Sequence, residues 1–524
     1  MESKRYLLFT VFVAGMSTLA IEFTASRMLQ TVYGTSNIVW ANVIGLVLFF
    51  LTLGYFIGGW WSDKRPFHAD FYALVTAAGM SSILFLLLMS MLLREAALAM
   101  AAVAVGSIAS SLVGVVLMIA VPITLLGCVS PFAVRLAVND VNEAGRISGQ
   151  IYAISTWGSL AGTYLPVLLV IPEAGTRWTA VIFGGILLTV GLIGLVRTQL
   201  PLAVMVLIGL LPLGLVVEHV VSQPIKQYRG QIYEMESAYN YIQVVRENDC
   251  NYLLLNEGQA FHSFYCDGGR VPVISVWSIM LAAPYFNEPA AVAAKGDDLV
   301  EDLAVIGLAA GSIPKQFMVH YEGVKVDGIE LDPGIVEVGR EYFEMTEPDL
   351  NVIVGDGRYA LNQLDKRYDV ITLDAYKVPY IPWHLTTQEF FEEVAAHLKD
   401  DGVLAINVGR VPNDRRLVEA VTATLQRVFP TVHTIDVPGA LNSILVATMV
   451  ETEPEWLMTN KQNVAGEVPP LLAQVLELAT ANLVPTVAGE VVFTDERAPV
   501  ETMIDSLVIR YLIEEGPSAL PSYE

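Results

Sequence analysis

Cysteine and histidine are both scarce in this chain, with 3 cysteines and 7 histidines among 524 residues. So few cysteines cannot form the framework of a disulfide-rich scaffold. Cys128 lies in an apolar stretch, whereas Cys250 and Cys266 could pair if their part of the chain faces an oxidising space. The histidines are scattered and none combines with cysteine at the spacing of a metal site, so we predict no metal.

Basic residues are also few, since 30 Lys and Arg stand against 54 Asp and Glu and the formal net charge is −24. Nucleic-acid phosphates need a basic surface, so this balance excludes nucleic acid as a partner. An acidic protein can attract a small cationic substrate through its long-range field, although solubility alone also explains such a charge. The charge therefore excludes one class of partner and leaves a cationic small molecule open.

Charge of either sign is nearly missing from residues 1–220, which hold 10 of the 30 basic and 9 of the 54 acidic residues. The remaining 20 basic and 45 acidic residues give residues 221–524 a charge of −25. At 54% hydrophobic residues, the chain is too apolar for one soluble enzyme. We predict a helical, multi-pass transmembrane domain over 1–220, embedded in the lipid bilayer of the cell membrane. Homo-oligomerisation stays open.

Seven apolar stretches in this region approach or exceed the length of a membrane span. They cover residues 6–28, 38–60, 71–93, 97–121, 149–171, 178–196 and 201–219. Most of the basic residues between them fall on the side of the N-terminus, which is therefore cytoplasmic. Pro122 and Pro131 make a broken or re-entrant segment within 97–137 one alternative. Closely spaced small residues predict close helix packing (Gly54, Gly58 and Gly59, and Gly158 and Gly162).

The acidic part changes its pattern along the chain. After a polar linker, residues 241–245 and 252–255 alternate as strands around a turn, which is typical of a small antiparallel subdomain within 221–290. Between 291 and 450, apolar runs at 303–306, 324–329, 351–354, 368–373 and 403–408 are separated by helical stretches. This alternation predicts an α/β, Rossmann-like domain. Residues 451–524 form an acidic C-terminal extension to which we assign no function.

The first four strands of the α/β region end in glycine or an acid. Gly307 and Gly311 follow the first strand, Glu330 and Asp332 the second, Asp356 and Gly357 the third, and Asp374 the fourth. Open α/β sheets bind ligands at the carboxyl ends of their strands. The pattern therefore predicts an adenosine-type pocket with Asp374 as a candidate catalytic carboxylate at its rim.

Together these segments resemble the spermidine synthase family of aminopropyltransferases, in the branch fused to an N-terminal multispan domain. The similarity covers roughly residues 235–450. It rests on Glu236–Asn240, Leu254–Gln259, the glycine turn, Glu330–Asp332, Gly355–Gly357, Asp374 and Ile381–Thr387. No single motif is specific, because a lone glycine turn is weak, but their order and spacing favour this fold.

The resemblance implies a role for each candidate residue. Glu330 would hold the ribose hydroxyls of an adenosyl donor, Asp356 and Gly357 the adenine, and Asp374 would accept the proton of the attacking amine. Gly307, Gly311 and Asp332 complete the donor side, while Asn240, Gln259, Tyr376 and Lys377 face the substrate. The implied co-substrate is decarboxylated S-adenosylmethionine, or S-adenosylmethionine itself, with no tightly bound cofactor.

The chain departs from the family on the amine side. An acid of the family's glycine loop reads Ala310 here, and its tyrosine-histidine-glutamate signature falls on Val276–Ser278. The second acid after the catalytic aspartate falls on Lys377, whose charge opposes a dication but could pair with the carboxylate of intact S-adenosylmethionine. Three hypotheses follow: an aminopropyltransferase with an altered acceptor, a methyltransferase on a membrane-associated substrate, and a transporter or sensor whose soluble domain binds an adenosyl ligand without turnover.

Two features of the sequence disagree on which side of the membrane the soluble domain lies. An odd number of spans from a cytoplasmic N-terminus places residue 221 onward outside the cell, where adenosyl donors are not normally supplied. A hidden further crossing, a re-entrant segment or true export would each account for this. Because the pocket chemistry needs the donor, we expect a cytoplasmic soluble domain.

Overall fold

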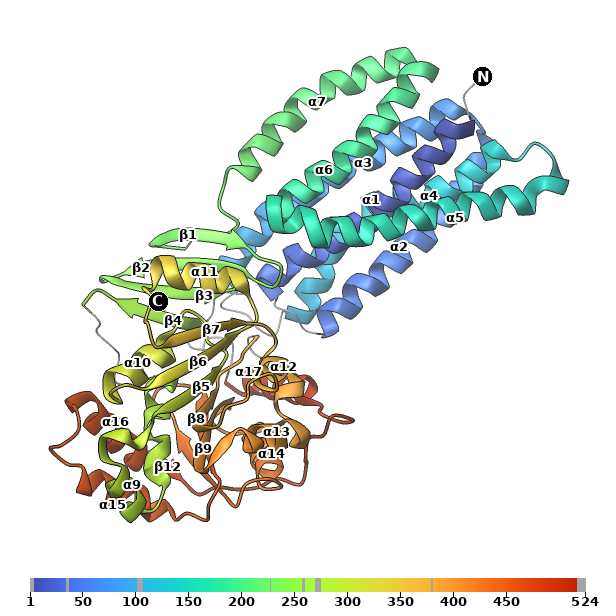
Figure 1. The fold of residues 1–524 in the computed structure, drawn as a ribbon. Coiled ribbons are helices and arrows are strands. Elements are labelled where there is room, and N and C mark those ends of the chain that lie inside the picture. The colour runs from blue at the N-terminus through green and yellow to red at the C-terminus, as the bar shows by residue number, and fades with distance from the viewer. Residues whose placement is uncertain are drawn as a thin grey trace. The chain divides into compact units, whose positions relative to one another are not determined.

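In the computed structural model, two compact units are formed by Met1–Arg229 with Glu234–Tyr241, and by Gly230–Tyr233 with Ile242–Glu524. The structure describes residues 4–33, 37–100, 107–226, 228–256, 260–268, 275–377 and 380–515. We call the first unit the membrane unit and the second the soluble unit. Figure 1 shows the long helices of the first and the mixed helices and strands of the second.

The membrane unit consists of long helices. They are α1 (Lys4–Tyr33), α2 (Asn37–Lys64), α3 (His68–Met100), α4 (Ser107–Ala137), α5 (Ala144–Leu165), α6 (Ile171–Thr198) and α7 (Leu200–Val221). In the described part of the chain, six helical stretches are long and apolar enough to cross a membrane. One of them, Val141–Thr198, is 58 residues long and comprises α5, the π-helical segment Pro166–Val170 and α6. Gly175 (φ 80°, ψ 169°) has a non-helical backbone conformation within α6. Helices α5 and α6 each have about the length of one span.

Close helix packing is confirmed at Gly54, Gly58, Gly158 and Gly162, but not at Gly59, where an added Cβ would meet no atom within 4 Å. A Cβ added to Gly158 or Gly162 would lie 2.0 Å from a backbone carbonyl oxygen of α1, and one added to Gly54 would lie 2.3 Å from the carbonyl oxygen of Thr124 in α4. The backbones therefore approach too closely for any side chain. Small residues allow such approach where lipid provides no hydrophobic drive between helices.

The region 97–137 differs from expectation. The predicted span at 97–121 lies partly outside the described residues, and α4 runs from Ser107 to Ala137 through both Pro122 and Pro131, which contradicts the alternative of a broken or re-entrant segment there. The flanking residues are apolar, and a helix satisfies almost all backbone groups where no water can. This requirement outweighs the local cost of proline, so the prolines do not break the helix.

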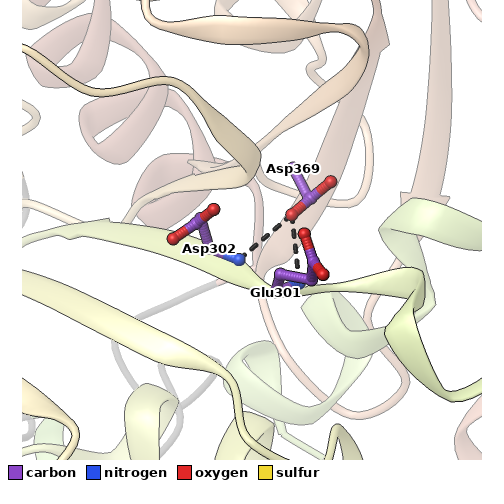
Figure 2. Close-up of side chains that lie close together, drawn as sticks. All are labelled: Glu301, Asp302 and Asp369. Atoms are coloured by element: carbon purple, nitrogen blue, oxygen red, sulfur yellow. Dashed lines mark hydrogen bonds between the residues drawn. The ribbon is translucent and has the colours of Figure 1, made fainter.

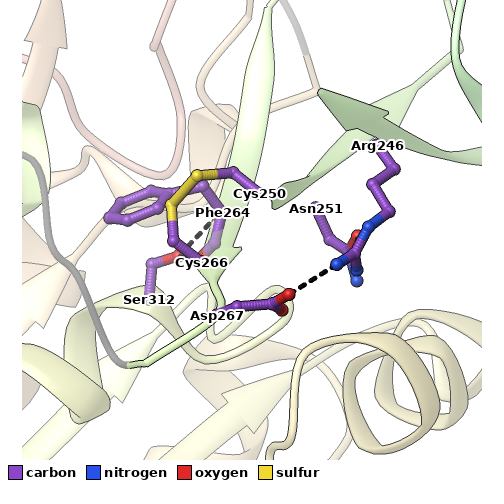
Figure 3. Close-up of a disulfide and its surroundings, with 7 residues drawn as sticks. All are labelled: Arg246, Cys250, Asn251, Phe264, Cys266, Asp267 and Ser312. Atoms are coloured by element: carbon purple, nitrogen blue, oxygen red, sulfur yellow. Dashed lines mark hydrogen bonds and ion pairs between the residues drawn. A yellow bond between two sulfur atoms is a disulfide. The ribbon is translucent and has the colours of Figure 1, made fainter. Parts of the chain in front are cut away.

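The smaller sheet is antiparallel, with strand order β1 (Gln231–Glu236), β2 (Tyr241–Glu247), β3 (Cys250–Leu255) and β4 (Phe261–Cys266). Asn248 and Asp249 both have positive φ in the predicted β2–β3 turn, as a tight hairpin requires. Cys250 and Cys266 are direct cross-strand partners and form a disulfide (Figure 3). The sequence left this pairing open because it depends on which strands are neighbours.

The larger sheet has the order β12-β10-β11-β9-β8-β5-β6-β7. Its strands are β5 (Asp302–Ile306), β6 (Lys325–Glu330), β7 (Leu350–Val354), β8 (Tyr368–Leu373), β9 (Leu398–Gly409), β10 (Thr431–Asp436), β11 (Asn442–Thr448) and β12 (Leu483–Val484). Strands β7, β6, β5, β8 and β9 run parallel, whereas β11 pairs antiparallel with β9 and β10. The predicted α/β, Rossmann-like fold is thereby confirmed.

Helices cover both faces of this sheet. They are α8 (Val276–Ile279), α9 (Pro289–Lys295), α10 (Ser312–His320), α11 (Pro333–Tyr342), α12 (Gly357–Leu361), α13 (Gln388–Ala396), α14 (Arg416–Leu425), α15 (Pro454–Asn463), α16 (Pro470–Ala481) and α17 (Val500–Glu515). Alternate residues of β5 enter opposite hydrophobic cores, Leu303 with Phe317 of α10 and Ala304 with Phe390 of α13. The sheet is therefore buried on both sides, as parallel strands require.

Three local features complete this domain. Helix α8 has only one α-helical turn and continues as a 3-10 helix over Met280–Phe286. The side chain of Thr387 caps α13 by accepting from the Phe390 amide. The segment after 450 is not a separate appendage, since β12 joins the sheet and α16 and α17 contribute to its two cores.

Candidate functional site

The glycine turn after β5 needs its glycines. Gly307 and Gly311 have φ of +89° and +88°, values that side chains rarely allow. A Cβ on Gly307 would lie 2.4 Å from the carbonyl oxygen of Asp374, so the turn passes directly beside the end of β8. The amides of Gly307 and Leu308 both donate to the carbonyl oxygen of Ile329 in β6. The turn is thus held between the ends of two neighbouring strands.

The small sheet supports the same turn. The Ala310 amide donates to Ser263 Oγ of β4 over 3.0 Å. Ser312 Oγ accepts from the Phe264 amide and donates to the Phe264 carbonyl oxygen (Figure 3). Phe264 is two residues from the disulfide, which fixes β4 to β3. The disulfide therefore lies close in sequence to contacts that hold the turn.

Glu330, at the end of β6, is 8% exposed and points its carboxylate at backbone amides. One oxygen accepts from the Ala309 amide over 2.9 Å and the other from the Asp332 amide over 3.0 Å. Burial raises the pKa of Glu330 to about 7, although these amides stabilise its ionised form. Each oxygen keeps a lone pair, so the pair could still accept two vicinal hydroxyl groups.

Asp332 and Asp356 both cap helices. Asp332 accepts from the Gly334 amide at the start of α11, and Asp356 accepts from the Arg358 and Tyr359 amides at the start of α12. The second oxygen of Asp356 lies 2.9 Å from Nε2 of His384. Burial raises the pKa of Asp356, but the Tyr359 amide and His384 outweigh it and the pKa is lowered. Asp356 is therefore an ionised carboxylate with a histidine partner.

Asp374 follows β8 and receives one neutral donor on each oxygen. Trp277 Nε1 donates to Oδ2 over 2.8 Å, and Asn407 Nδ2 donates to Oδ1 over 2.8 Å. Asn442 in turn donates to Asn407 Oδ1 over 2.9 Å, which fixes the orientation of that amide. Burial raises the pKa of Asp374, and the bonds from Asn407 and Trp277 oppose the rise only in part. The group is a fixed carboxylate of increased basicity.

The predicted donor-side residues share one edge of the sheet. Gly307, Glu330, Asp356 and Asp374 follow the adjacent strands β5, β6, β7 and β8 at their carboxyl ends. The Asp374 amide donates to the Ile306 carbonyl oxygen, and the Gly355 amide donates to that of Glu330. A Cβ on Gly357 would lie 2.6 Å from Ile306, so α12 begins against the end of β5. This edge is where open parallel sheets bind ligands.

The residues that we predicted to face the substrate do not all lie in the described part of the soluble unit. The Tyr376 hydroxyl donates to the Asn407 carbonyl oxygen and accepts from the Gly409 amide, so it is bonded to β9. Burial and the charge of Asp505 raise the pKa of Glu501 in α17, whereas the charge of Lys377 lowers it. Lys377 therefore has an acidic neighbour in Glu501. Asn240 belongs to the membrane unit, and Gln259 lies outside the described residues.

A second acidic group lies at the opposite edge of the sheet. Glu301, Asp302 and Asp369 have carboxylate oxygens within 4.8 Å of one another (Figure 2). Asp369 accepts from the Glu301 and Asp302 amides at the start of β5. Lys399 pairs with all three carboxylates, and Lys295 and Lys366 add further ion pairs. The lysine ammonium groups therefore balance the charge of these carboxylates, as a bound metal ion would.

Sequence reasoning missed the partners that hold the site. Trp277 and Asn407 were not assigned to Asp374, nor His384 to Asp356. Trp277 lies 97 positions from Asp374, and no local pattern links them. The one signal that we had for this segment was that Val276–Ser278 differs from the tyrosine-histidine-glutamate signature that the resembling family has there.

Comparisons with known proteins agree with this architecture. Residues 292–460 match the model of the spermine/spermidine synthase domain. The probable polyamine aminopropyl transferase of Bifidobacterium longum is 31% identical over 219 residues, 41% of this chain and 46% of that protein. The polyamine aminopropyltransferase of Vibrio vulnificus is 29% identical over 167 residues, 31% of this chain and 54% of that protein. This chain spans about half the length of these curated relatives.

A methyltransferase has about the same sequence identity to this chain as these aminopropyltransferases have. The eEF1A lysine and N-terminal methyltransferase of Mus musculus is 32% identical over 186 residues, which are 33% of this chain and 25% of that protein. The resemblance to spermidine synthases is confirmed for the C-terminal part of the chain by the matched domain model. Sequence identity alone does not separate the two kinds of transferase.

Proposed function

We propose, from the premise that residues 292–460 form a spermine/spermidine synthase domain, that this chain is a membrane-anchored aminopropyltransferase. The observation that carries the proposal is the environment of Asp374. Its carboxylate is partly buried, held by two neutral donors, and adjacent to the glycine turn. A fixed base of raised pKa at a ligand-binding sheet edge suits transfer to an amine.

The reaction is a displacement at carbon. The unprotonated amine nitrogen attacks the methylene carbon bonded to the sulfonium sulfur, and a new carbon–nitrogen bond forms. The carbon–sulfur bond breaks, its electron pair stays on sulfur, and neutral methylthioadenosine leaves. Asp374 takes the proton that the amine nitrogen must lose, and holds that nitrogen in line.

The donor would be held by the other strand-end residues. Glu330 has two oxygens that can accept the ribose hydroxyls, and Asp356 with Gly357 would contact the adenine. The turn at Gly307–Gly311 would let the backbone approach the donor closely. Decarboxylated S-adenosylmethionine is the donor in this scheme, and a cationic amine is the acceptor.

Methyl transfer from S-adenosylmethionine is the second candidate. It is favoured by the similarity to the mouse methyltransferase and by a cation, Lys377, close to the end of β8. A cation could pair with the carboxylate that distinguishes intact S-adenosylmethionine from the decarboxylated form. Glu501 already interacts with the charge of Lys377, which weakens the argument for a ligand carboxylate at this position.

The nucleoside product distinguishes the two reactions. Purified full-length protein in lipid nanodiscs is incubated with either donor and a series of diamines. Aminopropyl transfer produces methylthioadenosine from the decarboxylated donor, whereas methyl transfer produces S-adenosylhomocysteine from the intact one. S-adenosylhomocysteine as the main product would replace the first candidate by the second. Thermal stabilisation by a donor without any product would favour a binding domain.

Removing the Trp277 donor should shift the pH dependence of the reaction. Trp277→Phe keeps a ring but loses the hydrogen bond that stabilises ionised Asp374, so the pKa of Asp374 rises further. Because a bond to a charged group is worth about 1.5–3 kcal/mol, we expect the acid limb of kcat/KM to move up by about one to two pH units. Trp383→Phe, at an exposed indole, is the matched control. An unmoved acid limb would remove Trp277 from this role.

We also propose that the soluble unit faces the side of the membrane opposite the N-terminus. In the described residues, α1–α7 give an odd number of crossings when α5 and α6 are counted as separate spans, and an odd number favours that side. The Cys250–Cys266 disulfide favours it independently, because disulfides persist in oxidising compartments. This proposal is the alternative to the cytoplasmic placement that we expected from the sequence, and in it the adenosyl donor would have to reach the outer side.

The oxidation state of the thiols tests this placement. Cells are quenched in acid and the denatured protein is alkylated without reductant. We expect one modified thiol, Cys128, and three after reduction. Three modified thiols before reduction would place the soluble unit in a reducing compartment.

A further inference from the structure

One contact beside the predicted donor site has no role in the proposed function. Nε2 of His384 lies 2.9 Å from Oδ2 of Asp356. Asp356 follows β7 and caps α12, whereas His384 belongs to the short 3-10 helix Trp383–Leu385 after β8. Both residues belong to the soluble unit. The contact therefore joins two segments that follow different strands at the same edge of one sheet.

The Asp356 carboxylate has one hydrogen-bonding position left. Its Oδ1 accepts from the Arg358 and Tyr359 amides over 3.1 and 3.0 Å, which uses both lone pairs of that oxygen. In the described part of the chain, His384 is the one group bonded to Oδ2, so the second lone pair of Oδ2 stays available. The Asp356 side chain is 42% exposed, and a ligand can therefore reach this carboxylate.

The bond from His384 gives the available lone pair one direction. Burial raises the pKa of Asp356, but the Tyr359 amide and His384 outweigh it, so the carboxyl group is ionised. An ionised carboxylate only accepts hydrogen bonds, and Nε2 of His384 therefore carries the hydrogen. With both oxygens bonded, the carboxylate cannot turn about its Cβ–Cγ bond. Without His384, Oδ2 would lose the partner that keeps it in place.

His384 is itself held against the start of α12. The Leu385 amide donates to the Pro382 carbonyl oxygen, which closes the 3-10 turn that carries His384. A Cβ on Gly357 would lie 3.8 Å from Leu385 Cδ1, so this turn packs on the first residue of α12. Arg358 Nη1 donates to the His384 carbonyl oxygen over 3.4 Å. The helix that Asp356 caps therefore also supports the histidine that binds Asp356.

Arg358 is fixed by carboxylates from two other segments. Its Nε and Nη2 donate to Glu393 of α13, and its Nη1 and Nη2 donate to the two oxygens of Asp495. Thr387 Oγ1 also donates to Asp495, over 2.7 Å. Paired bonds from a planar guanidinium fix its orientation as well as its position. The C-terminal extension, to which the sequence alone assigned no function, thus takes part in holding His384.

We propose that His384 is a positioning residue for the donor nucleoside, because its Nε2–H directs the available lone pair of Asp356 Oδ2 toward the 6-amino group of adenine. This inference rests on the proposed function, in which Asp356 contacts the adenine. It deepens that function by naming what the contact selects, a purine with a 6-amino donor. A carboxylate that is already oriented loses little freedom when the ligand binds, so the bond to the amino group contributes more to affinity.

Binding of two nucleosides to the full-length protein in nanodiscs tests this selection. The probes are methylthioadenosine and its analogue without the 6-amino group, and calorimetric titration measures both affinities. We expect methylthioadenosine to bind at least about tenfold more tightly, because the analogue lacks one hydrogen bond to a charged group. Equal affinities, or no binding of methylthioadenosine, would overturn the proposal.

Two variants of His384 then test the residue itself. His384→Phe keeps a ring without the N–H, and we expect it to reduce the ratio of the two affinities to less than about threefold. His384→Gln places an amide N–H near the position of Nε2 and should restore most of the ratio. An unchanged ratio in His384→Phe, or the same loss in both variants, would contradict the hydrogen-bonding role.

The matched control is His397→Phe in the same domain. The ring nitrogens of His397 contact the carbonyl oxygens of Glu393 and Leu364, away from Asp356. We expect this variant to lower the thermal midpoint and to keep the ratio of affinities. If His397→Phe reduced the ratio as much as His384→Phe, general destabilisation would explain both and the proposal would fall.

The binding ratio also separates this proposal from the proposed function. It needs neither an acceptor nor turnover, so it stays valid if the protein transfers a methyl group or nothing at all. Where aminopropyl transfer is observed, His384→Phe should raise the donor KM about threefold to tenfold and change the acceptor KM less than about twofold. Donor and acceptor KM that rise together would overturn the role of His384 in positioning the donor.

Discussion

Replacing Asp374 with asparagine is expected to lower the turnover number by at least about 10²-fold and to change the donor Kd less than about threefold. The amide cannot take a proton from the amine. It is nearly the same size as the carboxylate and keeps one oxygen for Trp277 or Asn407, so the site stays assembled. Steady-state kinetics and donor titration on the same preparation measure both quantities.

The matched control for this variant is Asp365→Asn, which removes one negative charge at an exposed position in the same domain. We expect it to behave as the unmodified protein. If Asp374→Asn retained full turnover, Asp374 would not be the proton acceptor. If it lost donor affinity and turnover in equal measure, the carboxylate would serve binding and not proton transfer.

Replacing Glu330 with glutamine is expected to raise the donor Kd about 10²-fold. The two carboxylate oxygens already accept backbone amides, so an NH₂ group in place of one oxygen would face a donor and could not accept a hydroxyl. The hydrogen bond lost from one ribose hydroxyl to a charged group is worth about 1.5–3 kcal/mol, and the other hydroxyl keeps only a neutral acceptor, so together the changes correspond to about 10²-fold. Calorimetric titration with the donor measures it.

The same residue predicts a pH dependence of donor binding. The pKa of Glu330 is raised to about 7, so a growing share of the carboxylate is protonated as the pH falls from 8 to 6. Only the ionised form accepts on both oxygens, and donor affinity should therefore fall below about pH 7. In Glu330→Gln this dependence should vanish. A wild-type affinity that rises on acidification would contradict the role of Glu330.

The residues at the ends of the strands could be predicted from the sequence because the pattern that marks them is local. An apolar run followed by glycine or an acid defines a buried strand and its carboxyl end, and parallel pairing then brings Gly307, Glu330 and Asp374 to one edge. The partners of these groups could not be predicted, because they come from distant elements. Trp277 precedes the sheet, and Asn407 belongs to a strand whose register with β8 must be known first.

The membrane unit shows the same distinction. Apolar length predicted the spans except in the region 97–137, and glycine spacing predicted close packing except at Gly59. The helical course of 107–137 could not be inferred from Pro122 and Pro131, because their local preference is outweighed by the apolar surroundings. The hydrogen bonds from Arg27 and Thr176 to Glu234–Tyr241 join positions far apart in the chain, so no local sequence pattern could predict them.

The central claim is that this sheet edge transfers an aminopropyl group. The most direct test uses decarboxylated S-adenosylmethionine labelled with carbon-13 in the aminopropyl chain, full-length protein in nanodiscs and a diamine acceptor. The account predicts that all of the transferred label is found on the amine, with methylthioadenosine released in equal amount. Label that stays attached to the nucleoside, while the donor still binds, would contradict it.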